Sequence, residues 1–248
     1  MAFSSFERAV YLAGRGGLRL YLRVGHGLQS SGTGHVPRTG GCLVAGNHPS
    51  LLDPAIILAT CPRPVRFMAA EVLFKTPFIR WFLRGAGMIR VDRKEGGAGA
   101  FRQALKALQA GEAVGIFPHG QLVGKYEEVT PKDGAVQLAV RAGVPVVPVY
   151  TEGTQYALPK KSIIPRLLRQ CAIVYGEPYT IPLTKADLKD QEKVSAATAA
   201  LMTRIKALKG LAKNLTRHAD YAPIAPFENV LRHADEHPEI WEAQARNR

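Results

Sequence analysis

Cys42-Leu43-Val44-Ala45-Gly46-Asn47-His48-Pro49-Ser50-Leu51-Leu52-Asp53-Pro54 is the stretch from which the fold of this chain can be worked out. Its apolar run, residues 42–45, predicts a strand. Pro54 predicts a helix over residues 54–59, because proline suits the first turn of a helix. The chain therefore changes from strand to helix within the few residues that hold His48 and Asp53.

The spacing of His48 and Asp53 suits a turn better than a helix. Five positions on an unbroken helix would rotate one side chain away from the other by roughly 140°. A turn can fold the carboxylate back to the imidazole, fix its tautomer and leave the other ring nitrogen free to take a proton from a hydroxyl. The pair therefore predicts a general base. In the alternative, Asp53 is only a helix N-cap before Pro54 and His48 is a loop histidine.

Strands and helices alternate along the rest of the chain. This order predicts an α/β fold with a largely parallel sheet flanked by helices. Ligands of such sheets gather at the carboxyl ends of the strands. His48 and His119 each follow a predicted strand, so we expect both at one edge. The predicted strands are 42–45, 65–69, 88–91, 113–117, 145–150 and 171–175, and the helices are 54–59, 77–83, 99–110, 134–142 and 185–208.

The charge is strongly basic and unevenly distributed. The 248 residues carry a net charge of +13. Residues 1–125 hold 16 Lys and Arg against 6 Asp and Glu, and residues 126–248 hold 17 against 14. A basic first half favours an anionic partner such as a membrane surface or a phosphorylated substrate. We expect no nucleic acid, since only charge supports it. The three cysteines lack metal-ligand spacing, which suggests a reduced, cytosolic protein.

The N-terminal segment is basic and amphipathic. Arg8, Arg15, Arg19 and Arg23 fall on one side of a helical projection and apolar residues on the other. They also interrupt any signal peptide, and no stretch is long and apolar enough to span a membrane. Because Gly14, Gly16 and Gly17 lie in the middle, we expect an amphipathic helical hairpin. Its apolar side would lie on an anionic bilayer or pack on the protein's own core.

Composition also suggests three parts of the chain. Residues 1–40 would hold the membrane-associating helices and a Gly/Ser-rich linker, and residues 41–210 the α/β domain. Residues 211–248 would form a more polar C-terminal tail that packs at the periphery or frays.

Further candidate residues follow other predicted strands. Arg93, which follows the strand 88–91, could hold a phosphate through its fork of donors, and Lys75 is a second cation of this kind. Phe117-Pro118-His119-Gly120 forms a tight turn in which glycine permits a close approach to a ligand. For Arg93 and Lys75 alone, a solvated charge is the more ordinary explanation.

Taken together, four blocks resemble the PlsC-like glycerolipid acyltransferases, the 1-acyl-sn-glycerol-3-phosphate acyltransferase superfamily. Residues 47–53 match its H-x4-D block, Gly87 to Arg93 its second block, Phe117 to Gly120 its third, and Val144 to Tyr150 its fourth. The similarity covers roughly residues 40–180, and the order of the blocks makes it specific.

The resemblance implies an O-acyltransferase of phospholipid biosynthesis. His48, oriented by Asp53, would deprotonate a hydroxyl of a lysophospholipid or glycerol phosphate, which attacks the thioester of acyl-CoA or acyl carrier protein. Arg93 and Lys75 would hold an acceptor phosphate, with Phe117, Pro118, His119 and Gly120 lining the acceptor site. No metal and no cofactor beyond the acyl donor is expected. The enzyme would work at the cytoplasmic side of a membrane, as a peripheral or monotopic protein.

The third block departs from the family. Where relatives have F-P-E-G-T-R-S, this chain has Phe117-Pro118-His119-Gly120-Gln121-Leu122-Val123. A histidine thus replaces a carboxylate, and an arginine that could anchor phosphate is missing. Lys125 or Lys132 could supply the lost cation. Two alternatives follow: a non-catalytic lipid-binding relative, and an acyl thioesterase that uses water as acceptor.

Overall fold

The computed structural model describes residues 5–71, 87–91, 97–123, 129–160, 162 and 164–216. Within them lies one seven-stranded sheet, and every neighbouring pair of strands is parallel except β6 and β7. The predicted α/β class is confirmed. The strands in spatial order are β1 (Gln29–Ser31), β7 (Ala172–Tyr175), β6 (Val146–Glu152), β2 (Cys42–Gly46), β5 (Ala113–Ile116), β3 (Val65–Ala70) and β4 (Ile89–Val91).

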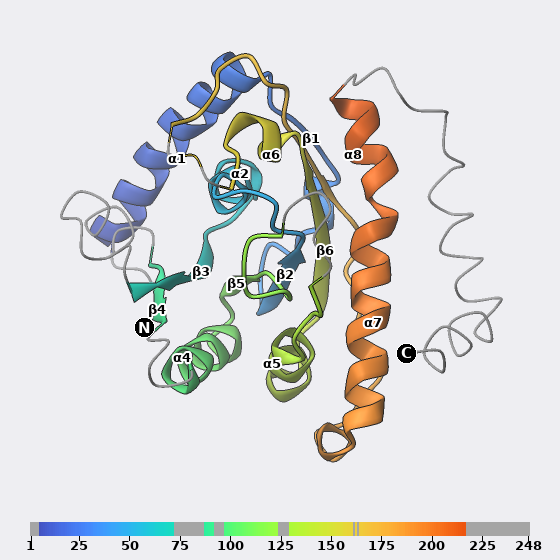
Figure 1. The fold of residues 1–248 in the computed structure, drawn as a ribbon. Coiled ribbons are helices and arrows are strands. Elements are labelled where there is room, and N and C mark those ends of the chain that lie inside the picture. The colour runs from blue at the N-terminus through green and yellow to red at the C-terminus, as the bar shows by residue number, and fades with distance from the viewer. Residues whose placement is uncertain are drawn as a thin grey trace.

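Helices cover both faces of this sheet (Figure 1). On one face lie α1 (Ser5–His26), α2 (Asp53–Thr60) and the short α6 (Thr154–Ala157). On the other lie α4 (Ala98–Gln109), α5 (Gly134–Ala142), α7 (Gln191–Ala207) and α8 (Lys209–Leu215). Two single turns of 3-10 helix, η1 (Thr33–His35) and η3 (Asp187–Lys189), complete the described elements.

The central strand β2 shows why both faces need cover. All five of its residues are buried. Val44 joins the core under α1 and α2, whereas Leu43 and Ala45 join the core under α4, α5 and α7. Side chains alternate between faces along a strand, so a strand that is apolar throughout must be covered on both sides. This arrangement leaves the strand ends as the place where polar side chains can gather.

The predicted helical hairpin at the N-terminus is wrong. One helix, α1, runs from Ser5 to His26, straight through the glycines at 14, 16 and 17. Each glycine costs about 1 kcal/mol relative to alanine inside a helix. Tertiary contacts outweigh that cost: Leu22 and His26 are fully buried, and the Arg15 guanidinium donates a hydrogen bond of 2.6 Å to the carbonyl of Cys61. No helix of the described residues is long and apolar enough to cross a bilayer.

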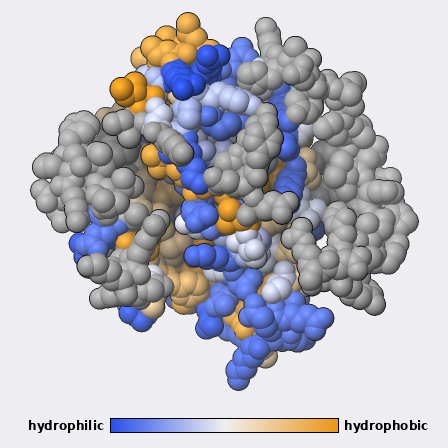
Figure 2. Space-filling view, viewed as in Figure 1, coloured by the Kyte–Doolittle hydropathy of each residue, from blue (hydrophilic) through white to orange (hydrophobic). Residues whose placement is uncertain are grey.

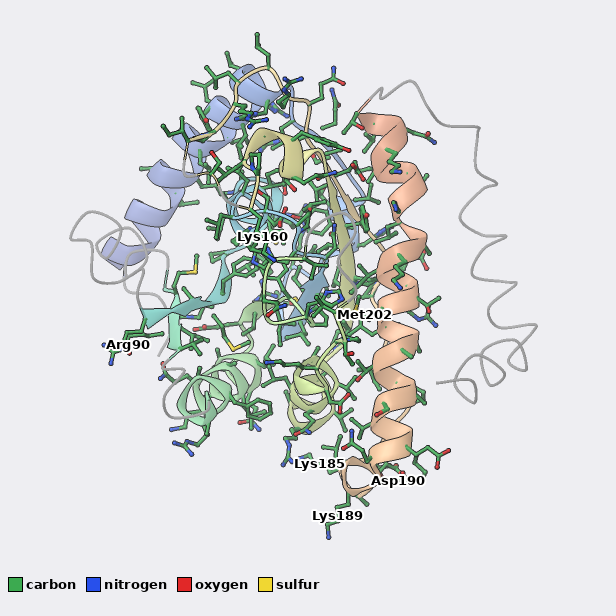
Figure 3. All side chains as sticks on the ribbon, in the orientation of Figure 1. Arg90, Lys160, Lys185, Lys189, Asp190 and Met202 are labelled. Atoms are coloured by element: carbon green, nitrogen blue, oxygen red, sulfur yellow. The ribbon has the colours of Figure 1, made fainter. Side chains whose placement is uncertain are left out.

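Two other boundaries differ from the predictions. The Gly/Ser-rich linker supplies β1, which pairs with β7. The helix predicted over 185–208 begins only at Gln191, because the Asp190 side chain caps it by accepting hydrogen bonds from two backbone amides. Lys185, Lys189 and Asp190 lie together beyond that end of α7 (Figure 3). The helix predicted over 77–83 and most of the C-terminal tail, residues 217–248, lie outside the described residues.

Candidate active site

His48 and Asp53 meet in the turn between β2 and α2. The Nδ1 atom of His48 lies 2.9 Å from Oδ2 of Asp53. The backbone amide of Ser50 donates to the same oxygen at 2.8 Å. The Asp53 side chain is fully buried, whereas that of His48 is 13% exposed. The carboxylate is therefore held inside the protein, and the imidazole bridges it to the surface.

The alternative explanation, in which Asp53 is only an N-cap, does not hold. Asp53 is the first residue of α2, and the preceding residue, Leu52, occupies the cap position without a side-chain cap bond. Both carboxylate oxygens of Asp53 instead turn back towards the strand ends. A negative charge at this helix N-terminus is also favoured by the helix dipole.

Thr151, at the end of β6, completes the environment of the carboxylate. Its hydroxyl donates to Oδ1 of Asp53 at 2.8 Å. The Asn47 side chain ties the same strand to β2: it accepts from the Thr151 amide and donates to the Thr151 carbonyl, both at 2.8 Å. Asp53 thus accepts three hydrogen bonds, and its orientation is determined from two strands. No role was predicted for Asn47 or Thr151, although each is a polar residue close to the end of a predicted strand.

Phe117 fixes the plane of the imidazole. The rings of His48 and Phe117 stack with centroids 3.9 Å apart and an angle of 9° between planes. Behind them Phe67 stacks on Phe117 with a centroid separation of 5.6 Å. Because Nδ1 of His48 donates to the carboxylate, Nε2 carries the lone pair. This nitrogen can accept a proton from a hydroxyl that donates a hydrogen bond to it.

The turn that holds His119 docks against the turn that holds His48. The Val123 amide donates to the His48 carbonyl at 2.8 Å, so the predicted juxtaposition of the two strand ends is confirmed. The buried Nδ1 of His119 has no hydrogen-bond partner among the described residues. Burial lowers the pKa of His119, and the charges of Lys206 and His48 lower it further. The ring is therefore neutral near pH 7 and offers one donor and one acceptor.

Gly120 ends this turn in a left-handed conformation, with φ of 68°. A Cβ built on it would lie 3.7 Å from the ammonium nitrogen of Lys132. The backbone amide of Lys132 also donates to the Pro118 carbonyl at 2.8 Å. Lys125 and Lys132 were the two candidates to replace the missing arginine. Of these, Lys132 is the one that the structure describes, and it lies beside this turn. Pro118 is buried and Phe117 half-buried.

A family model described as Acyltransferase matches residues 27–152, which run from before β1 to the end of β6. The 1-acyl-sn-glycerol-3-phosphate acyltransferase of Bacillus subtilis is 31% identical over 206 residues, which cover 81% of this chain and 92% of that protein. The chain belongs to the acyltransferase family. More specifically, it is a PlsC-like O-acyltransferase.

One further relative and one solved structure are similar to this acyltransferase. A 1-acyl-sn-glycerol-3-phosphate acyltransferase of Borreliella burgdorferi is 29% identical over 121 residues, 48% of each chain. The crystal structure of PlsC, the 1-acyl-sn-glycerophosphate acyltransferase of Thermotoga maritima, aligns with a TM-score of 0.63 at 21% identity. It covers 88% of this chain and 81% of that one, and shows a shared fold.

The three cysteines of the acyltransferase are core residues. Cys42, Cys61 and Cys171 are all free and buried. Burial raises the pKa of Cys61 to about 11 and that of Cys171 to about 12. Burial also raises the pKa of Cys42. A thiolate, the reactive form of cysteine, is therefore disfavoured at all three positions. Among the described residues, no cluster of three or more His, Cys, Asp or Glu could hold a metal ion.

Two predicted substrate-binding residues of the acyltransferase, Lys75 and Arg93, lie outside the described residues, as does Lys125. Their roles stay predictions. The neighbouring Arg90 lies on β4 at the sheet edge (Figure 3) and pairs with Glu71 at 3.5 Å. Arg90 is thus paired on the surface of the edge strand. His48, in contrast, follows the central strand β2, and Thr151 lies near the end of the central strand β6.

Proposed function

We propose that this protein transfers a fatty acyl group from acyl-CoA or acyl carrier protein to the hydroxyl of a lysophospholipid or glycerol phosphate. The observation that carries the proposal is the His48–Asp53 pair, with a buried and triply hydrogen-bonded carboxylate behind a partly exposed imidazole. An adjacent carboxylate holds the productive tautomer and stabilises the imidazolium that forms when the ring takes a proton.

The proposed reaction needs only a general base with its carboxylate and hydrogen-bond donors for the oxyanion. Nε2 of His48 takes the proton of the acceptor hydroxyl, and the oxygen attacks the thioester carbonyl. A tetrahedral oxyanion forms, which backbone amides of the neighbouring turns could stabilise. Its collapse breaks the carbon–sulfur bond, and the departing sulfur receives the proton from His48. The products are an ester and a free thiol, and no cofactor, metal or covalent enzyme intermediate is required.

The acceptor would bind at the turn from Phe117 to Gly120. His119 stands where relatives carry glutamate, and its unpartnered, buried Nδ1 supports a role in binding an acceptor hydroxyl. Lys132, whose ammonium lies beside Gly120, would hold an acceptor phosphate. Arg93 and Lys75 remain candidates for the same phosphate. An anionic membrane surface would supply the lipid acceptor, and the exposed Arg19 and Arg23 of α1 favour contact with it. On this proposal the protein is peripheral or monotopic, on the cytoplasmic side.

The test is thiol release from palmitoyl-CoA on liposomes, with lysophosphatidic acid, lysophosphatidylcholine, glycerol 3-phosphate or no acceptor. We expect acceptor-dependent release that His48→Ala lowers by about a thousandfold or more without changing thermal stability. Release without any acceptor would instead indicate a thioesterase. Should CoA thioesters be inert, acyl carrier protein thioesters are tested next. Inertness with both donors, or full activity of His48→Ala, would contradict the proposal.

Lys132→Gln tests the phosphate contact separately. We expect the KM of a phosphorylated acceptor to rise several-fold, since an ammonium is lost from the acceptor turn. Lys189→Gln, which removes the lysine at the end of η3, just before α7 begins, is the matched control (Figure 3). Equal KM values for both variants would exclude Lys132 from the acceptor site.

A further inference from the structure

The loop after α6 exposes three large apolar side chains that lie close together in the chain. Ile164 is 72% exposed, Leu167 58% and Leu168 85%. Leu168 also has a φ of 60°, a left-handed conformation that is rare for a bulky residue. A backbone hydrogen bond holds it there, because its amide donates to the Gly25 carbonyl at 2.7 Å. The leucines are therefore presented outward by a fixed backbone.

This loop and the second half of α1 form one surface. A Cβ built on Gly25 would lie 3.3 Å from the side chain of Leu167. On the same helix Leu20 is 65% exposed and Val24 73%. Figure 2 shows apolar and strongly polar side chains together at the top of the molecule, over the end of α1 and the loop after α6. We call the residues Leu20, Val24, Ile164, Leu167 and Leu168 the apolar patch.

The charges around the apolar patch are of one sign. Arg19, Arg23, Arg166 and Arg169 are exposed, and none forms an ion pair with a described residue. Residues 12–28 and 157–170 contain no aspartate or glutamate. Exposed apolar side chains among arginines fit the headgroup boundary of an anionic bilayer, which accepts both.

A second copy of the chain fits this surface poorly. A two-fold interface brings the same patch of both subunits together, so it would place the arginines of one copy against those of the other. Like charges brought together across an interface oppose association. The surface charge therefore favours a lipid occupant over self-association.

The loop also connects to the candidate active site. It begins at Leu158, whose carbonyl accepts a 2.7 Å hydrogen bond from the Ser50 hydroxyl. The backbone amide of Ser50 in turn donates a hydrogen bond to the carboxylate of Asp53. The apolar patch is thus attached, through one buried serine, to the turn that carries His48.

We infer that residues Ile164–Leu168 insert into an anionic lipid bilayer, together with the exposed face of α1, and hold the catalytic turn at the membrane surface. The inference rests on the proposed membrane partner of α1 and adds a second, separate segment to it. Binding does not depend on turnover, so its test is independent of the acyl-transfer test.

The experiment is cosedimentation of the full chain with vesicles of phosphatidylcholine and phosphatidylglycerol. Leu167→Gln/Leu168→Gln should lower the partition coefficient about tenfold, since two leucines lose their burial in lipid. Arg166→Gln/Arg169→Gln should lower it about tenfold on these vesicles, and much less on pure phosphatidylcholine. Leu211→Gln, a change at a 40% exposed leucine on α8 of the other face, should leave it unchanged.

Two controls keep the outcomes separate. Each variant should retain wild-type thermal stability and thiol release with a short-chain, water-soluble thioester, and His48→Ala should bind vesicles like wild type. Wild-type binding by the leucine variant would overturn the role of the loop, and absence of binding by the wild type would overturn the membrane partner itself. Sedimentation velocity without lipid covers the remaining case: a dimer that the leucine variant converts to monomer would make the patch an interface between copies.

Discussion

The turn that carries Asp53 and the turn that carries His119 lie side by side but differ in how completely their polar groups are paired. Asp53 accepts hydrogen bonds from His48, Ser50 and Thr151. The buried Nδ1 of His119 has no partner among the described residues. Buried polar groups are normally hydrogen-bonded, and the exceptions require an explanation. The polar groups of the first turn are fully paired, and we propose that a bound acceptor completes the pairing of the second.

We expect the largest effect on activity from a substitution of Asp53, where the hydrogen bonds of the first turn converge. Asp53→Asn keeps the size of the side chain but removes the charge that stabilises the imidazolium and the acceptor that sets the tautomer. We expect kcat to fall about a thousandfold, measured as thiol release. Because the two residues act as one unit, Asp53→Asn should cost little more in a His48→Ala background. If the kcat losses of the two single variants were instead fully additive in the double variant, His48 and Asp53 would act independently.

A substitution of His119, in the second turn, should change the KM of the acceptor and not kcat. His119→Ala removes a group that we expect to contact only the acceptor, so the KM of the acceptor should rise about tenfold, the value of one lost hydrogen bond in a desolvated site. The KM of the acyl donor should stay the same. An equal fall in kcat for every acceptor would show instead that His119 acts on the chemical step.

Thr151 tests how far the preorganisation of Asp53 depends on β6. Thr151→Val keeps the shape and removes the hydroxyl that donates to Oδ1, so we expect kcat to fall several-fold and the protein to lose about 1 kcal/mol of stability. Thr198→Val is the matched control, because Thr198 is an equally buried threonine whose hydroxyl donates to Asp133 at 2.7 Å. It should lose similar stability and keep its kcat. If both variants lost kcat equally, the loss in Thr151→Val would be explained by its lower stability and not by the contact with Asp53.

The smallest effect concerns pH. The pKa of His119 is lowered in the folded protein, so below the ordinary histidine pKa the unfolded chain binds a proton that the folded one resists. The stability that the neutral ring contributes is thus complete above pH 6.5 and declines as the pH falls below it. Unfolding of wild type and His119→Gln between about pH 8 and 5 should therefore diverge only in the acidic range, with wild type losing more. His26, whose pKa burial also lowers, is common to both proteins and cancels. Parallel curves would place His119 in a solvated environment.

Much of this fold could be predicted because it depends on short-range patterns. The helix 134–142 was predicted with the bounds that α5 has, since it ends at a glycine that adopts the left-handed conformation. Propensity failed at α1, where the glycines at 14, 16 and 17 predicted a break. The burial of Leu22 and His26 provides more stabilisation than those glycines cost, and such contacts are not readable from the segment itself.

In the candidate site, too, some features follow from local sequence and others only from tertiary contacts. The sequence by itself determined that a strand leads into a helix at residues 42–54, and that His48 and Asp53 can meet in the turn between them, because five residues of chain limit their separation. Only the tertiary structure decided that Thr151, 98 residues away from Asp53, supplies its remaining hydrogen bond, and that Phe117 stacks on His48. Those contacts depend on β5 and β6 flanking β2, and that strand order follows from packing both sheet faces against helices rather than from any local pattern.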